Sequence, residues 1–157
     1  LSDFTVWMLE RSMKTLGIRV KAQNKNAKKI ARFLEQHEWI SKVYYPGLKS
    51  HPDYKLAKTQ MKSFGAMLSF ELAEGLDASA FLKALKLIKP SMSLAGVEST
   101  MLLPYLASHA LLSQEERDAQ GITNQLIRFS VGIESKKDIV NDIEQALAEV
   151  SVAVMVN

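Results

Sequence analysis

The sequence has no cysteine, only four prolines and seven glycines among its 157 residues, and no long apolar run. The missing cysteine excludes disulfides, thiolate metal ligands and a cysteine nucleophile, and it fits a reducing compartment such as the cytoplasm. No stretch approaches the roughly 20 apolar residues that a membrane-spanning helix needs, so we expect no membrane partner. Because 47% of the residues are apolar, the chain is expected to bury a core and fold as a globular protein.

The chain begins without an initiator methionine and without the pattern of a signal peptide. We therefore expect it to be cut from something longer.

The formal net charge of +3 hides an uneven distribution. Residues 1–62 carry 13 basic and 5 acidic side chains, a balance of +8, whereas residues 63–157 carry 7 and 12, a balance of −5. A basic half favours a nucleic-acid interpretation. However, the lysines within residues 21–32 lie opposite an apolar stripe at helical spacing, and no aromatic residues interleave with them to stack bases. This pattern indicates the solvated face of a helix, and we expect no nucleic-acid partner.

Periodicity and turn signals place the expected elements along the chain. Helices are expected over residues 4–16, 20–37, 53–61, 77–85, from 113 and from 135 onward, and strands over 40–45, 66–72, 87–89, 98–103 and 126–134. Many connections between them are too short for βαβ crossovers. The sequence therefore predicts an α/β protein of the α+β type, with a mostly antiparallel sheet covered by helices.

The strand expected over 126–134 carries a single arginine. Ile127, Phe129, Val131 and Ile133 alternate onto one side, which leaves Arg128 on the other side. A guanidinium is rarely buried unless paired, and it is well suited to binding a planar anion through two hydrogen bonds. Two interpretations follow: Arg128 binds an anionic ligand, or it forms an ion pair with Glu98 or another carboxylate.

No other pattern in the sequence indicates a catalytic site. Of the three histidines, His37 is expected on a helix surface and His51 in a turn, and only His109, after Ser108, is a candidate for a site. No spacing typical of metal ligands, no glycine-rich phosphate loop and no G-x-S-x-G elbow is present. We therefore expect no metal.

Several short blocks resemble the Cys/Met-metabolism PLP-dependent enzymes, the family of cystathionine γ-synthase, cystathionine β- and γ-lyases and methionine γ-lyase. S-L-A-G-V-E-S at 93–99 resembles the family's S-L-G-G-x-E-S motif, and the Arg128 strand follows at the family's spacing. Further blocks in the same order are residues 9–16, 42–48, 50–52, 64–72, 108–109 and 115–117. The resemblance implies the small C-terminal domain of a fold-type I PLP enzyme, with a helix that links it to the large domain over 1–19, the domain itself over 20–150 and a tail over 151–157.

The resemblance also implies roles for individual residues. Arg128 matches the arginine that binds the α-carboxylate of the amino-acid substrate, and Ser93 matches a loop residue beside that carboxylate. Met92 stands where relatives carry a substrate-selecting residue, often Glu or Tyr. Because methionine is neither, the resemblance does not imply which of the family's reactions is catalysed. Ala95 replaces the family's first glycine in the loop, and Ser108 stands where relatives often have threonine and is expected to line the site.

The family's catalytic lysine, the aromatic residue that stacks on the cofactor and the aspartate that pairs with its ring nitrogen lie upstream in relatives. The resemblance therefore implies pyridoxal 5'-phosphate as the cofactor of the complete enzyme, and an amino acid such as cystathionine or methionine as substrate. It implies no catalytic and no cofactor-binding residue in this chain, which we expect to be inactive by itself. A homo-oligomer is expected, and apolar surface at Phe4, Trp7 and Met8 is expected to promote self-association.

A stand-alone interaction or dimerisation module with a vestigial site is the alternative. Met92, Ala95 and the missing lysine context favour that alternative.

Overall fold

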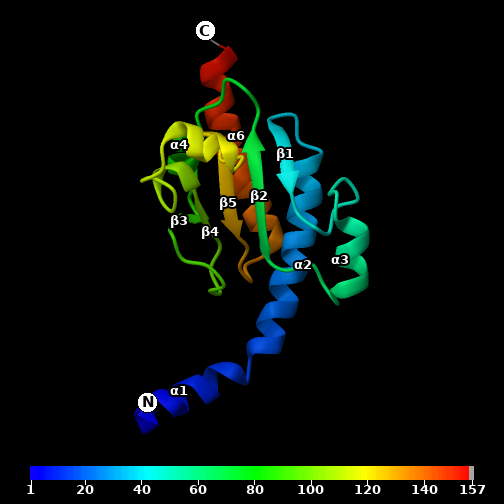
Figure 1. The fold of residues 1–157 in the computed structure, drawn as a ribbon, viewed down its shortest axis with the longest axis vertical. Coiled ribbons are helices and arrows are strands. Elements are labelled where there is room, and N and C mark those ends of the chain that lie inside the picture. Colours follow the sequence, from blue (N-terminus) through cyan, green and yellow to red (C-terminus); the bar gives the residue numbers. More distant parts are fainter. Residues whose placement is uncertain (156–157) are drawn as a thin grey trace.

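The computed structural model describes residues 1–155, in which helices cover one face of a five-stranded sheet (Figure 1). The helices are α1 (Asp3–Met13), α2 (Leu16–Glu35), α3 (Tyr54–Gln60), α4 (Ala78–Ala84), α5 (Gln114–Ala119) and α6 (Lys136–Met155). The strands are β1 (Ile40–Tyr44), β2 (Met67–Leu72), β3 (Lys89–Pro90), β4 (Thr100–Leu102) and β5 (Leu126–Ser130), and a 3-10 turn spans Pro104–Leu106.

The strand order is β1-β2-β5-β4-β3, and every neighbouring pair is antiparallel except β3 and β4. The mostly antiparallel sheet predicted from the short connections is therefore confirmed. β5 lies in the centre of the sheet, because β2 pairs with it on one side and β4 on the other. Its residues are consequently held by hydrogen bonds from both sides.

The core lies between one face of the sheet and helices α2, α4 and α6. On β2, Leu68, Phe70 and Leu72 point into this core, as their alternation predicts. On β5, Ile127 and Phe129 do the same and are fully buried. The facing helices contribute Ala27, Ile30, Ala31, Leu34, Phe81, Leu82, Ile139, Ile143, Ala146 and Val150.

Local capping explains where two of the short helices begin. Asp77 accepts hydrogen bonds from the backbone N–H groups of Ser79 and Ala80 and so caps α4. Ser113 and Glu116 form a reciprocal capping box at the start of α5, as the sequence predicts. Such signals are read from three or four adjacent residues, which is why the sequence is sufficient to find them.

The alternation expected to continue to residue 134 ends earlier. β5 stops at Ser130, and Ile133 is 42% exposed, so placing Ile133 on the buried face was wrong. The chain leaves the sheet there because the Ile133 N–H donates to the carbonyl of Val97 in a neighbouring loop. That loop competes with the strand for the backbone hydrogen bonds of this segment.

The ends of the chain also differ from the expected boundaries. The break between the first two helices falls at residues 14–15, so that Gly17 lies inside α2 and not between two helices. α6 continues to Met155, across the boundary at 150 that was expected to begin a tail. The alternation of Val152, Val154 and Val156 leaves two interpretations open, an edge strand or a terminal remnant, and the residues up to Met155 continue α6 and form no edge strand. Val156 lies outside the described residues.

α1 stands away from the rest of the molecule as an arm (Figure 1). None of its residues is buried, and Phe4, Trp7 and Met8 are 70%, 53% and 43% exposed. The expected apolar surface is therefore present. Within residues 1–155, no helix combines the length and the apolar character that crossing a bilayer requires.

Candidate functional site

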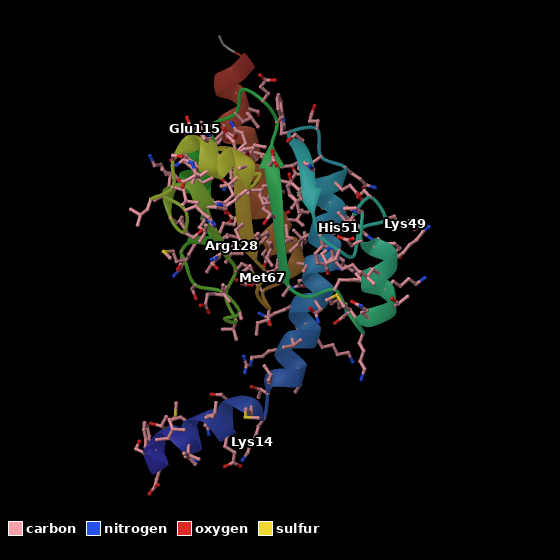
Figure 2. All side chains as sticks on the ribbon, in the orientation of Figure 1. Lys14, Lys49, His51, Met67, Glu115 and Arg128 are labelled. Atoms are coloured by element: carbon pink, nitrogen blue, oxygen red, sulfur yellow. The ribbon has the colours of Figure 1, made fainter. Side chains whose placement is uncertain are left out.

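Arg128 lies on the face of the sheet opposite the α2–α6 layer. In the ladder, Ser69 of β2 pairs with Arg128 on one side and Leu102 of β4 pairs with it on the other. Tyr44 of β1 pairs with Ser69, so Tyr44, Ser69, Arg128 and Leu102 form one row across four strands. Figure 2 labels Arg128 in the central part of the sheet. The arginine is therefore presented by the most rigid part of the sheet.

The guanidinium is held by one nitrogen and leaves the others for a ligand. Nη2 donates to the carbonyl oxygens of Met92 at 2.9 Å and of Ser93 at 3.4 Å. Nε and Nη1 make no hydrogen bond with the described residues, and Arg128 forms no ion pair with Glu98 or another described carboxylate. An oriented guanidinium with free donors matches a planar carboxylate in geometry and in charge.

The loop over residues 91–99 that supports Arg128 is fixed by side chains of two strands. The Thr100 hydroxyl donates to the carbonyl of Ser93 at 2.8 Å, and the Ala95 N–H donates to Ser130 Oγ at 3.0 Å. From α2, Gln23 donates to the carbonyl of Gly96 at 2.7 Å. Because β4, β5 and α2 all hold this loop, the carbonyl groups that orient Arg128 are themselves held in place.

A buried network joins the far end of the loop to the segment after β5. The Ser99 N–H and hydroxyl donate to the carboxylate of Glu134 at 2.5 Å and 3.0 Å, and Ser99 Oγ accepts from the Gly132 N–H at 2.9 Å. A side chain at Gly132 would overlap the carbonyl of Val97 and the Glu134 carboxylate. Glycine is therefore required at 132 by close backbone approach.

Ala95 is the one non-glycine residue among residues 1–155 with a positive φ, at 61°. An L-residue with a side chain is disfavoured there, because Cβ approaches the following carbonyl oxygen. The bonds of Ser130 and Gln23 to its neighbourhood keep the loop in this conformation. The positive φ of Ala95 therefore strains the loop beside Arg128.

Of the other predicted site residues, some contact Arg128 and some do not. Ser93 and Met92 meet Arg128 through their carbonyl groups, and the Met92 side chain is 64% exposed. Ser108 is exposed and its hydroxyl bonds to His109 Nδ1 at 2.8 Å. Its only described side-chain hydrogen bond is with this neighbour, so the structure brings Ser93 and Met92 to Arg128 but shows no contact from Ser108 or His109.

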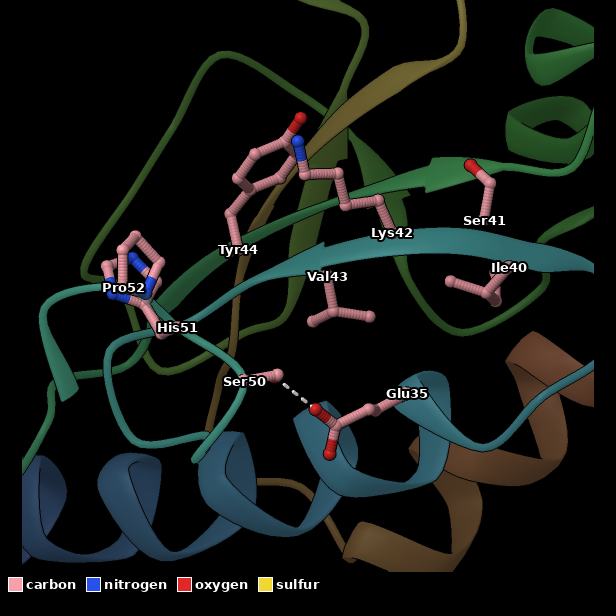
Figure 3. A pocket seen from close by; sticks show the side chains of 9 residues that line it. All are labelled: Glu35, Ile40, Ser41, Lys42, Val43, Tyr44, Ser50, His51 and Pro52. Carbon is pink, nitrogen blue, oxygen red and sulfur yellow. Dashed lines mark hydrogen bonds between the residues drawn. The ribbon is translucent and has the colours of Figure 1, made fainter.

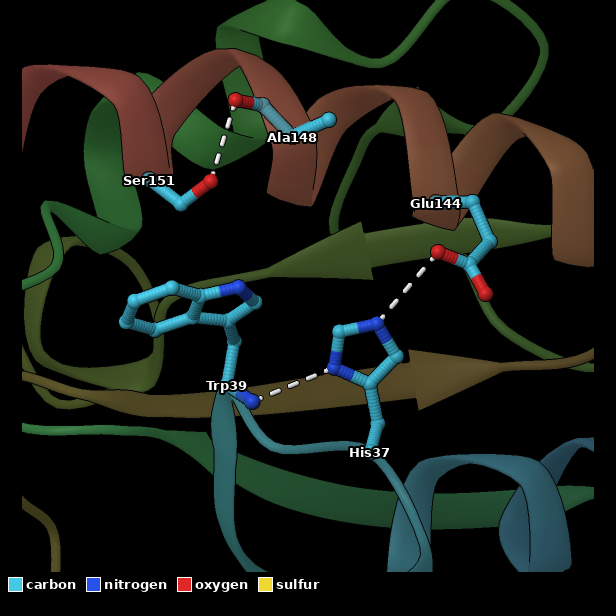
Figure 4. A network of polar contacts seen from close by, with 5 residues as sticks. All are labelled: His37, Trp39, Glu144, Ala148 and Ser151. Atoms are coloured by element: carbon cyan, nitrogen blue, oxygen red, sulfur yellow. Dashed lines mark hydrogen bonds and ion pairs between the residues drawn. The ribbon is translucent and has the colours of Figure 1, made fainter.

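The other two histidines have structural partners. His37 is half-buried, with its Nε2 3.3 Å from Glu144 of α6, and its Nδ1 accepts from the Trp39 N–H (Figure 4). The expectation that His37 is solvated was therefore wrong, because α6 covers the end of α2. His51 Nδ1 accepts from the Asp53 N–H, which fits the expected turn. No cluster of three or more acidic or histidine side chains with the arrangement of a metal site occurs in residues 1–155.

A second concavity of about 330 Å³ lies along the outer edge of β1 (Figure 3). Its residues are Glu35, Ile40, Ser41, Lys42, Val43, Tyr44, Ser50, His51 and Pro52. Ser50 donates to the Glu35 carboxylate, and the Tyr44 hydroxyl donates to Glu71 at 2.5 Å. Burial and the Glu71 carboxylate raise the pKa of Tyr44. Ser50 and Glu35 are paired with each other and Tyr44 with Glu71, whereas Arg128 keeps free donors, so Arg128 remains the stronger candidate for a binding site.

Sequence reasoning missed the residues that hold the loop. Glu134 and Ser99 enter the sequence analysis only as parts of motifs, and Gln23 and Asn26 do not enter it at all. Asn26 in fact donates to the carbonyl oxygens of Gly132 and Glu134 from more than 100 residues away in sequence. The available signal was two amides within an apolar stripe, which require partners when buried.

Three comparisons with known proteins identify the same enzyme family. The family model described as "Cys/Met metabolism PLP-dependent enzyme" matches residues 1–148. The chain is 45% identical to a cystathionine beta-lyase from Lactococcus lactis subsp. cremoris (strain MG1363) over 90% of this chain and 37% of the relative. It is 47% identical to an L-methionine gamma-lyase from Fusobacterium nucleatum subsp. polymorphum over 89% of this chain and 36% of that protein.

The fold is also similar to that of solved structures of cystathionine lyases and synthases. The crystal structure of cystathionine gamma-lyase from Lactobacillus plantarum, complexed with L-serine, superimposes with a TM-score of 0.89 at 41% identity. The match covers 92% of this chain and 38% of that one. The chain therefore spans a little over a third of the length of the relatives that it matches.

Proposed function

Since this chain belongs to the Cys/Met metabolism PLP-dependent enzyme family, we propose that it forms the part of such an enzyme that binds the substrate's α-carboxylate. The observation that supports the proposal is Arg128, which is oriented by two carbonyl groups and has free donors on the open face of the sheet. A carboxylate that accepts from a free Nε–H or Nη1–H donor is held at one position, which fixes the orientation of the amino acid relative to the reacting centre.

The substrate class is a sulfur-containing amino acid of the cystathionine or methionine type, acted on by a lyase or synthase. Relatives named as cystathionine beta-lyase and L-methionine gamma-lyase support this class. The side chain of Met92 lies beside the carbonyl that holds Arg128 and is exposed on the same loop. This position allows it to contact the part of the substrate beyond the carboxylate.

The residues around Arg128 do not fit pyridoxal phosphate itself. The cofactor requires a lysine amine and an anionic partner for its ring nitrogen, because it acts as an electron sink. The described contacts of Arg128 are carbonyl oxygens, and no lysine amine or carboxylate is hydrogen-bonded to it. Under this proposal the chain orients the substrate. The cofactor is held by the region that corresponds to the unmatched part of the relatives, and this chain alone has no lyase activity.

The exposed arm supports a second candidate, a stand-alone interaction or dimerisation module. α1 presents Phe4, Trp7 and Met8 with no partner among the described residues. The two functions differ in the residue on which they depend. Carboxylate binding depends on Arg128, whereas association depends on α1.

The test of carboxylate binding on this chain is a titration of the Arg128 Nε–H NMR signal with L-methionine and with L-methioninamide. The two ligands differ in the carboxylate, so the proposal predicts a saturable shift with the acid and none with the amide. The same response to both, or no response to the acid at concentrations up to its solubility, would contradict it.

A further inference from the structure

A stripe of lysines on α2 is exposed and unpaired. The helix carries six basic residues and one acidic residue, Glu35, at its last position. Lys21, Lys25 and Lys28 recur at spacings of four and three, which places their side chains side by side on one face. The opposite face of the helix is the one that packs into the core.

These lysines surround a shallow concavity of about 360 Å³, lined by Gly17, Val20, Lys21, Asn24, Lys25, Lys28 and Ser63. Ser63 belongs to the segment between α3 and β2 and is held against α2. The Asn24 side chain donates to Ser63 Oγ at 2.7 Å. Because Ser63 accepts this bond, its own hydroxyl proton is available for an acceptor in the concavity.

The positive charge at this site is not compensated. The ion pairs of the described side chains are Lys14 with Glu10 and His37 with Glu144, and neither involves the stripe. The charge continues onto the start of α6, where the neighbouring Lys136 lowers the pKa of Lys29, with burial and Lys25 adding to the effect. Lysines three and four positions apart on one helix face also repel one another, and a bound anion relieves that repulsion.

We propose that this lysine pocket binds a small, multiply charged phosphate anion, with a diphosphate group as its ligand class. Lysine ammonium groups act as mobile point charges that suit the dispersed oxygens of phosphates. Three ammonium groups balance the charge of about −3 that a diphosphate carries, and the Ser63 hydroxyl supplies one further hydrogen-bond donor. The site thereby differs from Arg128, whose planar fork suits a single carboxylate.

A concave site also separates this ligand class from nucleic acid. The lining contains no aromatic side chain on which bases stack. The three lysines converge on one concavity, which suits a compact anion with several charges.

The experiment is calorimetric titration of the full chain with inorganic pyrophosphate at constant ionic strength. We expect saturable binding at one site. The triple variant Lys21→Gln, Lys25→Gln, Lys28→Gln should bind at least tenfold more weakly. The matched control removes the same charge elsewhere, as Lys83→Gln, Lys86→Gln, Lys89→Gln, and should stay within twofold. Equal weakening by both triples, or no saturable binding, would overturn the proposal.

Three further measurements sharpen the result. ATP should bind within about tenfold of pyrophosphate and adenosine should not bind, and equal binding of adenosine would overturn the proposal. Duplex DNA bound in preference to pyrophosphate would also overturn it. If circular dichroism shows that the lysine triple variant does not fold, Ser63→Ala replaces it. We expect this variant to bind pyrophosphate about threefold more weakly, and an unchanged affinity would count against the site. Arg128→Gln should leave pyrophosphate binding within twofold, which separates this inference from the proposed function.

Discussion

Ala95 adopts a backbone conformation that glycine adopts at lower cost. Its φ of 61° places it in the left-handed region, which disfavours a Cβ by about 1–2 kcal/mol. Glycine loses about 0.5–1 kcal/mol more chain entropy on folding. We therefore predict that Ala95→Gly raises the free energy of unfolding by about 0.5 kcal/mol or more in urea titrations. Ala148→Gly, in the exposed interior of α6, is the control and should lower it by about 1 kcal/mol. A destabilised Ala95→Gly would contradict the assigned strain.

Tyr45 gives the molecule a defined alkaline instability. Burial raises the pKa of Tyr45 to about 12, above the value of about 10 in an unfolded chain. The neutral phenol is thus favoured in the fold, so this contribution to stability is complete below pH 10 and is lost as the pH rises towards 12.

We predict that the stability of the unaltered chain falls between pH 10 and 12 by up to about 2 kcal/mol more than that of Tyr45→Phe. At neutral pH the variant should be less stable by about 1 kcal/mol, because it lacks the hydrogen bond from the Tyr45 hydroxyl to the carbonyl of Gly65. The measurement is thermal or urea unfolding of both proteins at a series of pH values. Parallel pH profiles for the two proteins would rule out the titration of Tyr45 as the cause.

At the scale of elements, α6 is attached to β3 through one buried carboxylate. Asp142 accepts from the backbone N–H groups of Lys86, Leu87 and Ile88, at 2.8–3.0 Å, and is itself buried. These N–H groups precede β3 and have no strand partner for the same bonds. The Asp142 carboxylate therefore accepts the hydrogen bonds that a neighbouring strand would accept if β3 were longer.

We predict that Asp142→Ala lowers the free energy of unfolding by about 3 kcal/mol, because it leaves buried backbone donors without acceptors. Asp142→Asn keeps one oxygen and should cost about half as much. The exposed neighbour Asn141→Ala is the control, with a change within about 0.5 kcal/mol. Urea unfolding measures all three, and an Asp142→Ala effect as small as that of Asn141→Ala would refute the role.

The sequence predicts elements well where the signals are local. The capping residues Asp77 and Ser113 and the alternation in β2 and β5 involve neighbours along the chain, and the structure confirms them. Asp142 bonds to groups 54–56 residues away, and Asn26 to groups 106 and 108 residues away. Periodicity contains no information about such partners, so the way in which the loop beside Arg128 is held could not be predicted from the sequence.

The candidate site likewise has a part that the sequence predicts and a part that it does not. Arg128 was identified as a lone guanidinium on the polar side of a strand, and the structure places it there, with Nη2 on the carbonyl groups of Met92 and Ser93. These acceptors are backbone atoms, which a pattern of side chains does not reveal. The roles of Arg128, Ser93, Met92 and Ser108 with a substrate stay predictions.

At the scale of the whole molecule, the exposed arm determines how the chain behaves in solution. α1 buries none of its residues, so removing it should leave the core unchanged. We predict that the full chain self-associates reversibly through the apolar side chains of this arm and that a chain lacking residues 1–13 is a folded monomer. Sedimentation velocity over a range of concentrations measures both. A full chain that stays monomeric at high concentration would contradict the prediction, and Arg32→Gln is a control expected to behave as the unaltered chain.

The most direct test of the central claim, that Arg128 binds the α-carboxylate, is steady-state kinetics of the complete PLP-dependent enzyme containing this chain. Removal of the charged partner of a carboxylate costs about 2 kcal/mol or more. Arg128→Gln should therefore raise KM for cystathionine by about 30-fold or more, with a smaller change in kcat. Arg32→Gln, on the exposed face of α2, should leave KM within twofold. A KM for Arg128→Gln that matches this control would contradict the claim.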